Sequence, residues 1–161
     1  MRERETVAPE GMSESEQRQF MDVALAESRH ALPDCSPNPP VGCVIVQGRD
    51  VVSRGYTGAP GRPHAEAAAL LALDPNMDPA GLSLFVTLEP CAFVGRTPSC
   101  AQAIVGAGIR RVFVGTLDPD PRNDGAGIAI MRAAGIEVRV GVAEPEVLAF
   151  LAAHLSTTPR S

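Results

Sequence analysis

The order of the predicted secondary-structure elements is the feature that most restricts how this chain can fold. Short apolar segments typical of strands alternate with segments of helical periodicity along the 161 residues. A tight turn over residues 47–50 joins the first two strands, which predicts that these two are antiparallel. A helix separates every later pair of successive strands, and helical crossovers place such strands parallel. We expect strands at 41–46, 51–56, 82–87, 112–115 and 136–140, and helices at about 15–31, 65–73, 98–107, 127–134 and 144–155.

This order predicts an α/β fold, a three-layer α/β/α sandwich. Its five-stranded mixed sheet is expected to have antiparallel strands 1 and 2 and parallel strands 3 to 5. Several helix ends are also marked in the sequence. Ser13 and Glu16 form a capping box before the first helix. Thr97 is the predicted N-cap of the third helix, Pro98 its first residue, and Gly108 its end.

One folded domain accounts for almost the whole chain. Residues 1–12 are charged and show no apolar period, so we interpret them as a disordered lead. The domain is expected to span residues 13–156, and residues 157–161 are expected to fray. No run of about 18 apolar residues predicts a membrane span, and the N-terminus lacks the apolar core of a signal peptide. We therefore expect a cytoplasmic protein.

The charged and sulfur-containing residues limit the chemistry. The net charge of −5 gives no reason to expect a nucleic-acid partner, which usually selects for a basic patch. All fourteen basic residues are arginine, so Schiff-base and lysine-nucleophile chemistry is excluded for this sequence. Four cysteines in a reducing compartment favour thiols and metal ligation over disulfides.

Three separated residues form a candidate metal set. His64, Cys91 and Cys100 can hold a zinc ion on three sides and leave a fourth position for water. Glu66 lies two positions after His64 and can move the protons of that water without binding the metal. The pattern H-x-E followed by P-C-x-x-C is typical of zinc deaminases that act on nucleobases. Here the second cysteine follows the first by nine positions rather than three.

Helix geometry decides whether His64 and Glu66 can act together. Residues two apart in a helix point roughly 200° away from each other. The two side chains therefore converge only if the helix begins at about Pro63, with both in its first turn. Cys100 is likewise expected in a first turn, where the helix dipole stabilises a thiolate. Glu66 would accept the proton of water and hand it to a leaving amine.

These residues also have purely structural interpretations. A lone histidine that opens an alanine-rich helix is structural in most proteins, and a buried Cys91 or Cys100 alone is more often a small apolar side chain. The combination of all the motifs favours zinc chemistry. Cys43 is expected in the core, whereas Cys35 lies in a proline-rich loop where it can be exposed. Glu89 can support its loop or act directly, and the sequence leaves both roles open.

These motifs resemble one family over about residues 15–155. The chain is similar to the deaminase domain of the bifunctional riboflavin-biosynthesis deaminase/reductase, within the cytidine-deaminase-like superfamily. The nine-residue step between the cysteines is that of this family and differs from the P-C-x-x-C of cytosine, guanine and transfer-RNA adenosine deaminases. The shared segments are PNPPVG (37–42), GRPHAE (61–66), VTLEPC (86–91), GRTPSC (95–100), AGI (107–109), DP (118–119) and AGIEV (134–138).

The resemblance implies roles for particular residues. It implies His64, Cys91 and Cys100 as zinc ligands and Glu66 as the proton shuttle. It implies a reaction in which water displaces an exocyclic amine from a diaminopyrimidinone ribosylamino phosphate (diaminohydroxyphosphoribosylaminopyrimidine), giving ammonia and a carbonyl. The family often forms dimers or tetramers, so a homo-oligomer is expected, with a small-molecule substrate and neither nucleic acid nor membrane as partner. The residues expected to contact the substrate are Asn38, Phe93, Arg96 and Asp118, with Arg96 as the phosphate ligand.

Three departures from the family keep other substrates open. Ala92-Phe93 stands where the family usually has Ser/Thr-His, and residues 118–127 read DPDPRNDGAG rather than D-P-N-P-x-V-x-G-x-G. The acids of this loop, Asp120 and Asp124, disfavour a phosphate if they face the pocket. We also expect no reductase domain in this chain. A deaminase of another aminated base or nucleoside, recruited to specialised metabolism, is the alternative enzyme. A catalytically silent zinc-binding scaffold is the alternative outside catalysis.

Overall fold

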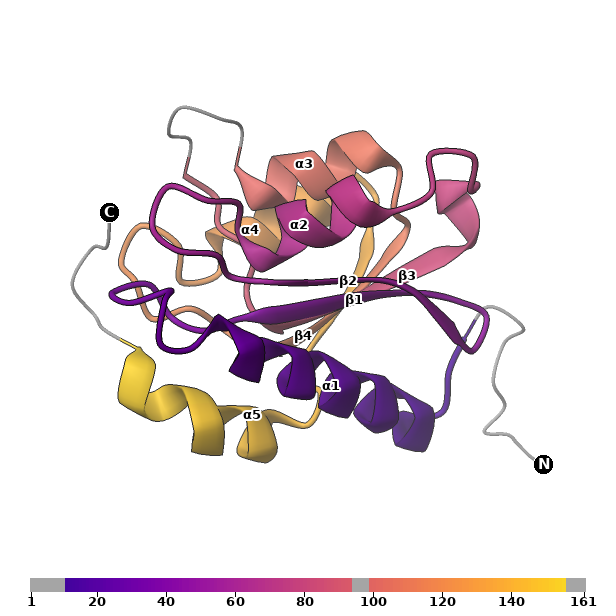
Figure 1. The fold of residues 1–161 in the computed structure, drawn as a ribbon. Coiled ribbons are helices and arrows are strands. Elements are labelled where there is room, and N and C mark those ends of the chain that lie inside the picture. The colour runs from indigo at the N-terminus through magenta and orange to yellow at the C-terminus, as the bar shows by residue number, and fades with distance from the viewer. Residues whose placement is uncertain (1–10, 94–98, 156–161) are drawn as a thin grey trace.

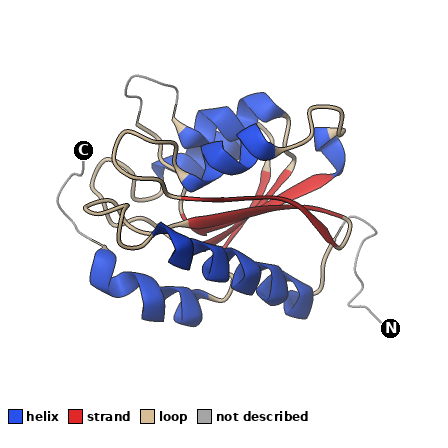
Figure 2. Cartoon of the chain, viewed as in Figure 1, coloured by secondary structure: helices blue, strands red, loops and turns tan. Residues whose placement is uncertain are grey.

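Five strands form a single mixed sheet in the computed structural model, which describes residues 11–93 and 99–155. The strands are β1 (Gly42–Gln47), β2 (Asp50–Tyr56), β3 (Leu82–Leu88), β4 (Arg111–Thr116) and β5 (Glu137–Val140). Their order in the sheet is β2-β1-β3-β4-β5 (Figures 1 and 2). Strand β1 is antiparallel to both of its neighbours, whereas β3, β4 and β5 are parallel. The predicted sheet is therefore confirmed.

Helices cover both faces of this sheet, as the predicted three-layer sandwich requires. Helices α1 and α5 lie against one face, and α2, α3 and α4 lie against the other (Figure 1). The helices are α1 (Glu14–Ser28), α2 (Ala65–Ala72), α3 (Cys100–Ala107), α4 (Ala126–Ala133) and α5 (Glu144–Leu151).

The position of β1 between β2 and β3 is a feature that the element order alone did not predict. Strands β2 and β3 run in the same direction, as the helical crossover through α2 requires. They are not hydrogen-bonded neighbours, because β1 pairs with both of them. The crossover thus passes over β1, and it brings the start of α2 close to the end of β3.

Strand β3 is the centre of the core. All seven of its residues are buried, which is expected for a strand covered by helices on both faces. Phe85 of β3 stacks on Phe113 of β4 with ring centroids 4.5 Å apart. The end of β3 leads directly into Glu89, Pro90 and Cys91, so this well-packed strand fixes the position of the first cysteine.

The predicted helix ends are partly confirmed. The capping box of Ser13 and Glu16 is present, and Gly108 ends α3 in the left-handed conformation with φ 84°. The predicted start of α3 is wrong, because its N-cap is Ser99, whose hydroxyl accepts from the backbone N–H of Gln102. The side chain of Gln102 completes that box by accepting from the backbone N–H of Ser99. Thr97 and Pro98 lie outside the described residues.

Helix α2 packs unusually close to the sheet, and this contact positions its first turn. A Cβ added to Gly55 of β2 would stand 2.3 Å from the carbonyl oxygen of Ala65 and 2.6 Å from the backbone nitrogen of Ala69. Glycine therefore lets the helix backbone rest directly on β2. Ser53 of β2 adds a hydrogen bond to this contact between β2 and α2, because its hydroxyl donates to the carbonyl of Ala69.

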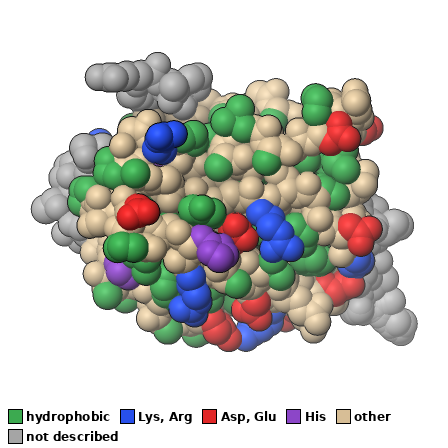
Figure 3. Space-filling model, viewed as in Figure 1, with side chains coloured by type: hydrophobic (Ala, Val, Ile, Leu, Met, Phe, Trp, Pro, Cys, Tyr) green, Lys and Arg blue, Asp and Glu red, His purple; other side chains and the backbone are tan. Residues whose placement is uncertain are grey.

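Charged side chains of both signs are scattered over the face seen in Figure 3, between apolar and neutral polar groups. No helix among the described residues has the length and apolar character needed to cross a bilayer.

Candidate active site

The three predicted metal ligands converge where helix starts meet the end of β3. His64 precedes α2, Cys91 follows β3, and Cys100 is the first residue of α3. Their candidate ligand atoms all lie within 4.8 Å of one another. The Nδ1 atom of His64 is 3.3 Å from Sγ of Cys100 and 4.0 Å from Sγ of Cys91. Residues 36 positions apart in sequence thus form one compact set.

The way in which His64 and Glu66 converge differs from the prediction. Helix α2 begins at Ala65, in agreement with the helix expected at 65–73, and His64 is its N-cap. Convergence of the two side chains therefore does not need the helix to begin at about Pro63, as helical spacing had predicted. The backbone of His64 is extended, with φ −70° and ψ 169°, so its ring direction does not follow the helical rotation of 100° per residue. An N-cap histidine and a first-turn glutamate can therefore face the same space although they are two residues apart.

The two cysteines are tied to each other by hydrogen bonds. The backbone N–H of Cys100 donates to Sγ of Cys91 over 3.3 Å, and that of Ala101 donates to the carbonyl of Cys91 over 3.0 Å. The hydrogen bond between the two thiols lowers the pKa of Cys91 to about 4 and raises the pKa of Cys100.

This donor set fits a zinc ion. A thiolate, a second sulfur and an imidazole nitrogen are ligands that Zn²⁺ prefers, and three protein ligands with an open fourth position are typical of catalytic zinc. A neutral imidazole with two thiolates leaves the centre formally neutral. The residues that would hold zinc are His64, Cys91 and Cys100.

Glu66 is a buried carboxyl beside this set. It lies in the first turn of α2, is 4% exposed and lines the same pocket as His64 and Cys91. Burial, followed by the negative charge of Cys91, raises the pKa of Glu66 to about 7.

Glu89 resolves the ambiguity that the sequence left. Its carboxylate is 3% exposed and accepts four backbone N–H groups from the β4–α4 loop and the start of α4. One oxygen accepts from Asp118 at 3.1 Å and Gly125 at 3.0 Å. The other accepts from Gly127 at 3.0 Å and Ile128 at 3.3 Å. Glu89 therefore supports the β4–α4 loop and caps the start of α4, which is the first of the two roles that the sequence left open.

The same corner depends on one glycine. A Cβ at Gly127 would stand 1.9 Å from the carbonyl oxygen of Pro90, so no larger residue fits without displacing the backbone. Asn123 closes the contact, because its amide donates to the carbonyl of Pro90 over 3.2 Å and accepts from the N–H of Gly127 over 3.1 Å. The start of α4 is thereby fixed to the peptide that carries Cys91.

A pocket opens over Glu66 and the metal set, with a volume of about 500 Å³ that includes its open mouth. Asn38, Phe93 and Asp118, three of the four residues expected to contact a substrate, line this pocket. The fourth, Arg96, lies outside the described residues. Arg122 also lines the pocket and was not predicted.

The proline-rich loop delivers Asn38 to the pocket. The backbone N–H of Cys35 donates to the carbonyl of Ala31 over 3.0 Å, and that of Asn38 donates to the carbonyl of Cys35 over 2.9 Å. These turns bury Cys35 completely, so the expectation that it can be exposed is wrong. Cys43 is buried in β1 as predicted.

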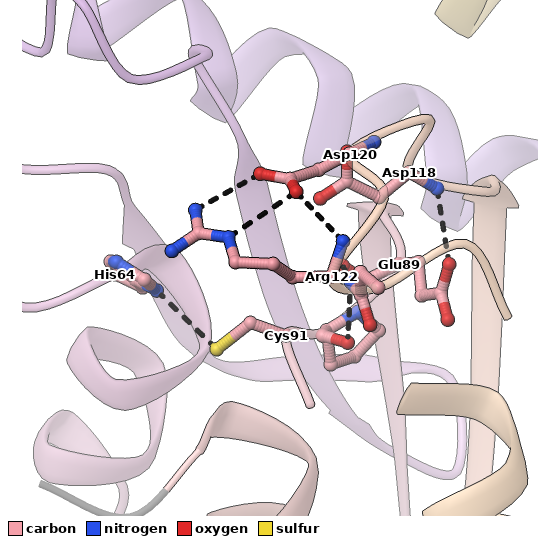
Figure 4. Close-up of polar contacts among 8 residues, drawn as sticks. His64, Glu89, Cys91, Asp118, Asp120 and Arg122 are labelled. Atoms are coloured by element: carbon pink, nitrogen blue, oxygen red, sulfur yellow. Dashed lines mark hydrogen bonds and ion pairs between the residues drawn. The ribbon is translucent and has the colours of Figure 1, made fainter. Parts of the chain in front are cut away.

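The acidic loop after β4 presents a cation to the pocket. Asp120 is fully buried, and its carboxylate accepts from the backbone N–H and the guanidinium of Arg122 (Figure 4). Neither Asp120 nor Asp124 lines the pocket, whereas Arg122 does. The guanidinium carbon of Arg122 lies 4.0 Å from the ring centroid of Phe93. The sequence signal for the Asp120–Arg122 pair is weak, because it consists only of an arginine two positions after an aspartate.

Comparison with known proteins agrees with this geometry. Residues 14–116 match the family described as the cytidine and deoxycytidylate deaminase zinc-binding region. The chain is 39% identical over 132 residues to the diaminohydroxyphosphoribosylamino-pyrimidine deaminase of Buchnera aphidicola, covering 80% of this chain and 86% of that protein. The chain therefore belongs to this deaminase family.

Longer relatives match the same region. The riboflavin biosynthesis protein RibD of Aquifex aeolicus is 45% identical over 129 residues, which are 80% of this chain and 36% of that protein. The crystal structure of a diaminohydroxyphosphoribosylaminopyrimidine deaminase/5-amino-6-(5-phosphoribosylamino)uracil reductase from Thermotoga maritima superposes with a TM-score of 0.82 at 37% identity. That match covers 88% of this chain and 40% of the other. The chain thus spans little more than a third of the length of these two relatives.

Proposed function

We propose that this chain is a zinc-dependent hydrolytic deaminase that removes an exocyclic amine from a heteroaromatic ring. The proposed substrate is the diaminohydroxyphosphoribosylaminopyrimidine of riboflavin biosynthesis or a close analogue. The observation that carries the proposal is the convergence of His64, Cys91, Cys100 and the buried Glu66 at one pocket. The 39% identity to a deaminase of similar length supports the choice of substrate.

The proposed reaction needs a nucleophile and a proton carrier. Zinc, when bound by His64, Cys91 and Cys100, lowers the pKa of water and so supplies a hydroxide-like nucleophile at neutral pH. Glu66 accepts the proton of the attacking water and then donates it to the amine nitrogen. The new carbon–oxygen bond replaces the carbon–nitrogen bond, and ammonia leaves. Burial of Glu66 excludes bulk water that would otherwise compete for this proton.

Substrate contacts are proposed for residues of the pocket wall. Asn38 and Asp118 provide polar groups, and Phe93 provides an aromatic face for the heterocycle or its arm. Arg96 remains a predicted phosphate ligand. Glu89 holds Asp118 through the backbone of that residue, so the polar wall is supported by the sheet rather than by a surface loop alone.

The experiment is a metal analysis followed by an activity assay. The purified chain is expected to carry one zinc ion by mass spectrometry and to release ammonia from the riboflavin-pathway pyrimidine phosphate. Removal of zinc with a chelator should abolish ammonia release, and added zinc should restore it. Absence of turnover by zinc-loaded protein at high enzyme concentration would overturn the proposed substrate.

A second candidate function is deamination of another aminated base or nucleoside. Phe93 favours it, because an apolar ring stands at the pocket where the resembled family usually has a polar side chain. Loss of one polar contact can change substrate discrimination by several orders of magnitude. Ammonia release across a panel of aminopyrimidines, aminopurines and their nucleosides decides between the two candidates.

Domain extent, location and oligomeric state also belong to the proposed function. We propose one deaminase domain over residues 13–156, which acts in the cytoplasm as a homo-oligomer on a small molecule. The net charge of −5 and the scattered charges in Figure 3 support a small-molecule substrate over nucleic acid. Light scattering on the zinc-loaded protein measures the oligomeric state.

A further inference from the structure

Asn123 is a buried amide that joins the segment before Cys91 to the start of α4. It is 3% exposed. Its amide nitrogen donates to the carbonyl of Pro90 over 3.2 Å and to that of Glu89 over 3.5 Å, and its amide oxygen accepts from the backbone N–H of Gly127 over 3.1 Å. Asn123 is not among the described residues that line the pocket, so its contacts point to a role other than substrate binding.

The backbone of Asn123 is held as firmly as its side chain. Its N–H donates to the carbonyl of Asp120 over 2.8 Å, and its carbonyl accepts from the N–H of Ala126 over 2.8 Å. A side chain on such a fixed backbone has few other rotamers that keep both ends of its amide bonded. The amide can therefore hold Pro90 in place rather than follow it.

The hydrogen bond to Pro90 acts on the backbone of Cys91, the first cysteine of the metal set. A peptide group is planar, so the carbonyl oxygen of Pro90 and the Cα of Cys91 move together. The peptide group on the other side of Cys91 is held as well, because its carbonyl accepts from the N–H of Ala101 over 3.0 Å. With both flanking peptide groups fixed, the Cα–Cβ bond of Cys91 has one direction, and the position of Sγ depends only on rotation about that bond.

Cys91 needs this support more than the other two candidate ligands. His64 is the N-cap of α2, and Cys100 is the first residue of α3, whose N-cap Ser99 takes part in a capping box. Cys91 instead lies beyond the end of β3, outside any helix or strand. Pro90 is buried, so loss of the amide would leave its carbonyl with one donor fewer and would favour movement of the peptide.

We propose that Asn123 is a positioning residue for Cys91 and that it sets how tightly this protein holds zinc. The role rests on the proposed function, because it requires His64, Cys91 and Cys100 to be the zinc ligands. Residues that orient a metal ligand typically contribute about 10- to 100-fold in metal affinity. The same hydrogen bonds make the β4–α4 loop and Cys91 one unit, so the pocket wall formed by this loop keeps its position relative to the metal set.

The test measures the zinc affinity of wild type, Asn123→Ala and Asn123→Val by competition with a chromophoric chelator at neutral pH. Both variants remove the hydrogen bonds of the amide, and their dissociation constants for zinc should rise about 10- to 100-fold. Valine leaves a smaller cavity than alanine, and it stands at this position in the family pattern D-P-N-P-x-V-x-G-x-G that residues 118–127 resemble. At equal cobalt(II) concentration, the thiolate-to-cobalt absorption band should also be weaker in both variants than in wild type.

Gln17→Ala is the matched control, because Gln17 is also a buried amide that donates to a main-chain carbonyl. It is 6% exposed, and its Nε2 donates to the carbonyl of Met12 over 2.8 Å. Gln17 lies in α1, which covers the face of the sheet opposite α2, α3 and α4 (Figure 1). Its replacement should lower the melting temperature, as Asn123→Ala does, but should leave the zinc affinity at the wild-type value.

The zinc dependence of turnover separates positioning from a direct part in the reaction. At limiting zinc both Asn123 variants should release ammonia more slowly than wild type, and saturating zinc should restore most of the turnover. Turnover that stays low at saturating zinc would mean that Asn123 acts on the reaction itself, which would contradict the inference.

The outcomes keep the two proposals apart. Wild type that binds no zinc overturns the proposed function. Wild type that binds zinc no more tightly than the two Asn123 variants overturns the role of Asn123. An equal loss of zinc affinity in Gln17→Ala overturns that role as well, because it would trace the loss to general destabilisation.

Discussion

Two buried glutamates of this protein, Glu66 and Glu89, are equally hidden from water but differ in their surroundings. Glu66 is 4% exposed and Glu89 is 3% exposed, and both line the same pocket. Glu89 receives four backbone N–H bonds from one loop and one helix start. Glu66 instead lies beside the metal set, where burial raises its pKa to about 7.

The difference shows that burial alone does not identify a catalytic carboxylate. A carboxylate whose oxygens are all occupied by backbone donors serves as a structural anchor. Desolvation instead raises the pKa of a carboxyl toward neutral pH. Such a carboxyl can both accept and donate a proton under physiological conditions, which suits a proton carrier.

The largest effect is expected for Glu66→Gln. Glutamine has the same shape but cannot accept and return a proton, so ammonia release should fall by about 10²- to 10⁴-fold. Zinc content and melting temperature should stay at the wild-type values, because the amide oxygen of glutamine can still accept the backbone hydrogen bond that the carboxylate of Glu66 receives. Undiminished turnover in the zinc-loaded variant would contradict the proposed role of Glu66. Glu14→Gln, which alters an exposed carboxylate of α1, is the matched control.

Glu89→Gln should act mainly on stability. Its amide group would face N–H donors of the β4–α4 loop or of α4, so buried donors would lose their acceptor. We expect a loss of about 3 kcal/mol in the free energy of unfolding, which lowers the melting temperature by roughly 6–12 °C. Urea unfolding and calorimetry measure this. A variant as stable as wild type but as inactive as Glu66→Gln would reverse the assignment of the two glutamates.

The smallest effect is expected for Glu16, a partly exposed carboxylate. The hydrogen bond from Arg49, and next that from the backbone N–H of Ser13, lower its pKa. Its stabilisation is therefore present above the unfolded pKa and is lost as pH falls through the lower folded pKa. Glu16→Gln should reduce the free energy of unfolding by less than about 1 kcal/mol at pH 7.

Urea unfolding of both proteins at pH 7 and at pH 3 checks the sign for Glu16. The gap between variant and wild type should narrow at pH 3, where the carboxylate of the wild type is increasingly protonated. A gap that widens on acidification would mean that the neutral form of Glu16 is the stabilising one.

Much of the fold followed from the sequence because its signals are local. Strand periodicity, the turn at 47–50 and the capping box at Ser13 each depend on a few neighbouring residues. The cluster of His64, Cys91 and Cys100 was also predicted, because H-x-E followed by P-C matches most of the pattern of zinc deaminases. The start of α2 at Ala65 was predicted, but the way in which His64 and Glu66 converge was not, since helical spacing says nothing about an N-cap side chain such as that of His64.

The remaining features depend on contacts between distant segments. In the order β2-β1-β3, the chain leaves β2, passes through α2 and enters β3 on the other side of β1. No local sequence pattern specifies which strand β3 pairs with after this crossover. The anchoring role of Glu89 required knowledge of which backbone N–H groups lie near it, some 29 to 39 residues further along. Arg122 was missed because its neighbour Phe93 is far away in sequence, and because Asp120 suggested an acidic wall.

The hydrogen bonds between Cys91 and the start of α3 have a consequence for how such proteins diversify. The backbone N–H groups of Cys100 and Ala101 both donate to Cys91. These hydrogen bonds hold the two cysteines together and do not involve the residues between them. Doubling the length of a flexible loop costs only about 0.6 kcal/mol in closure entropy. The metal set can therefore tolerate insertions here, from the two intervening residues of P-C-x-x-C to the eight of this chain. The segment is a natural place to graft randomised sequence when new substrates are sought by directed evolution.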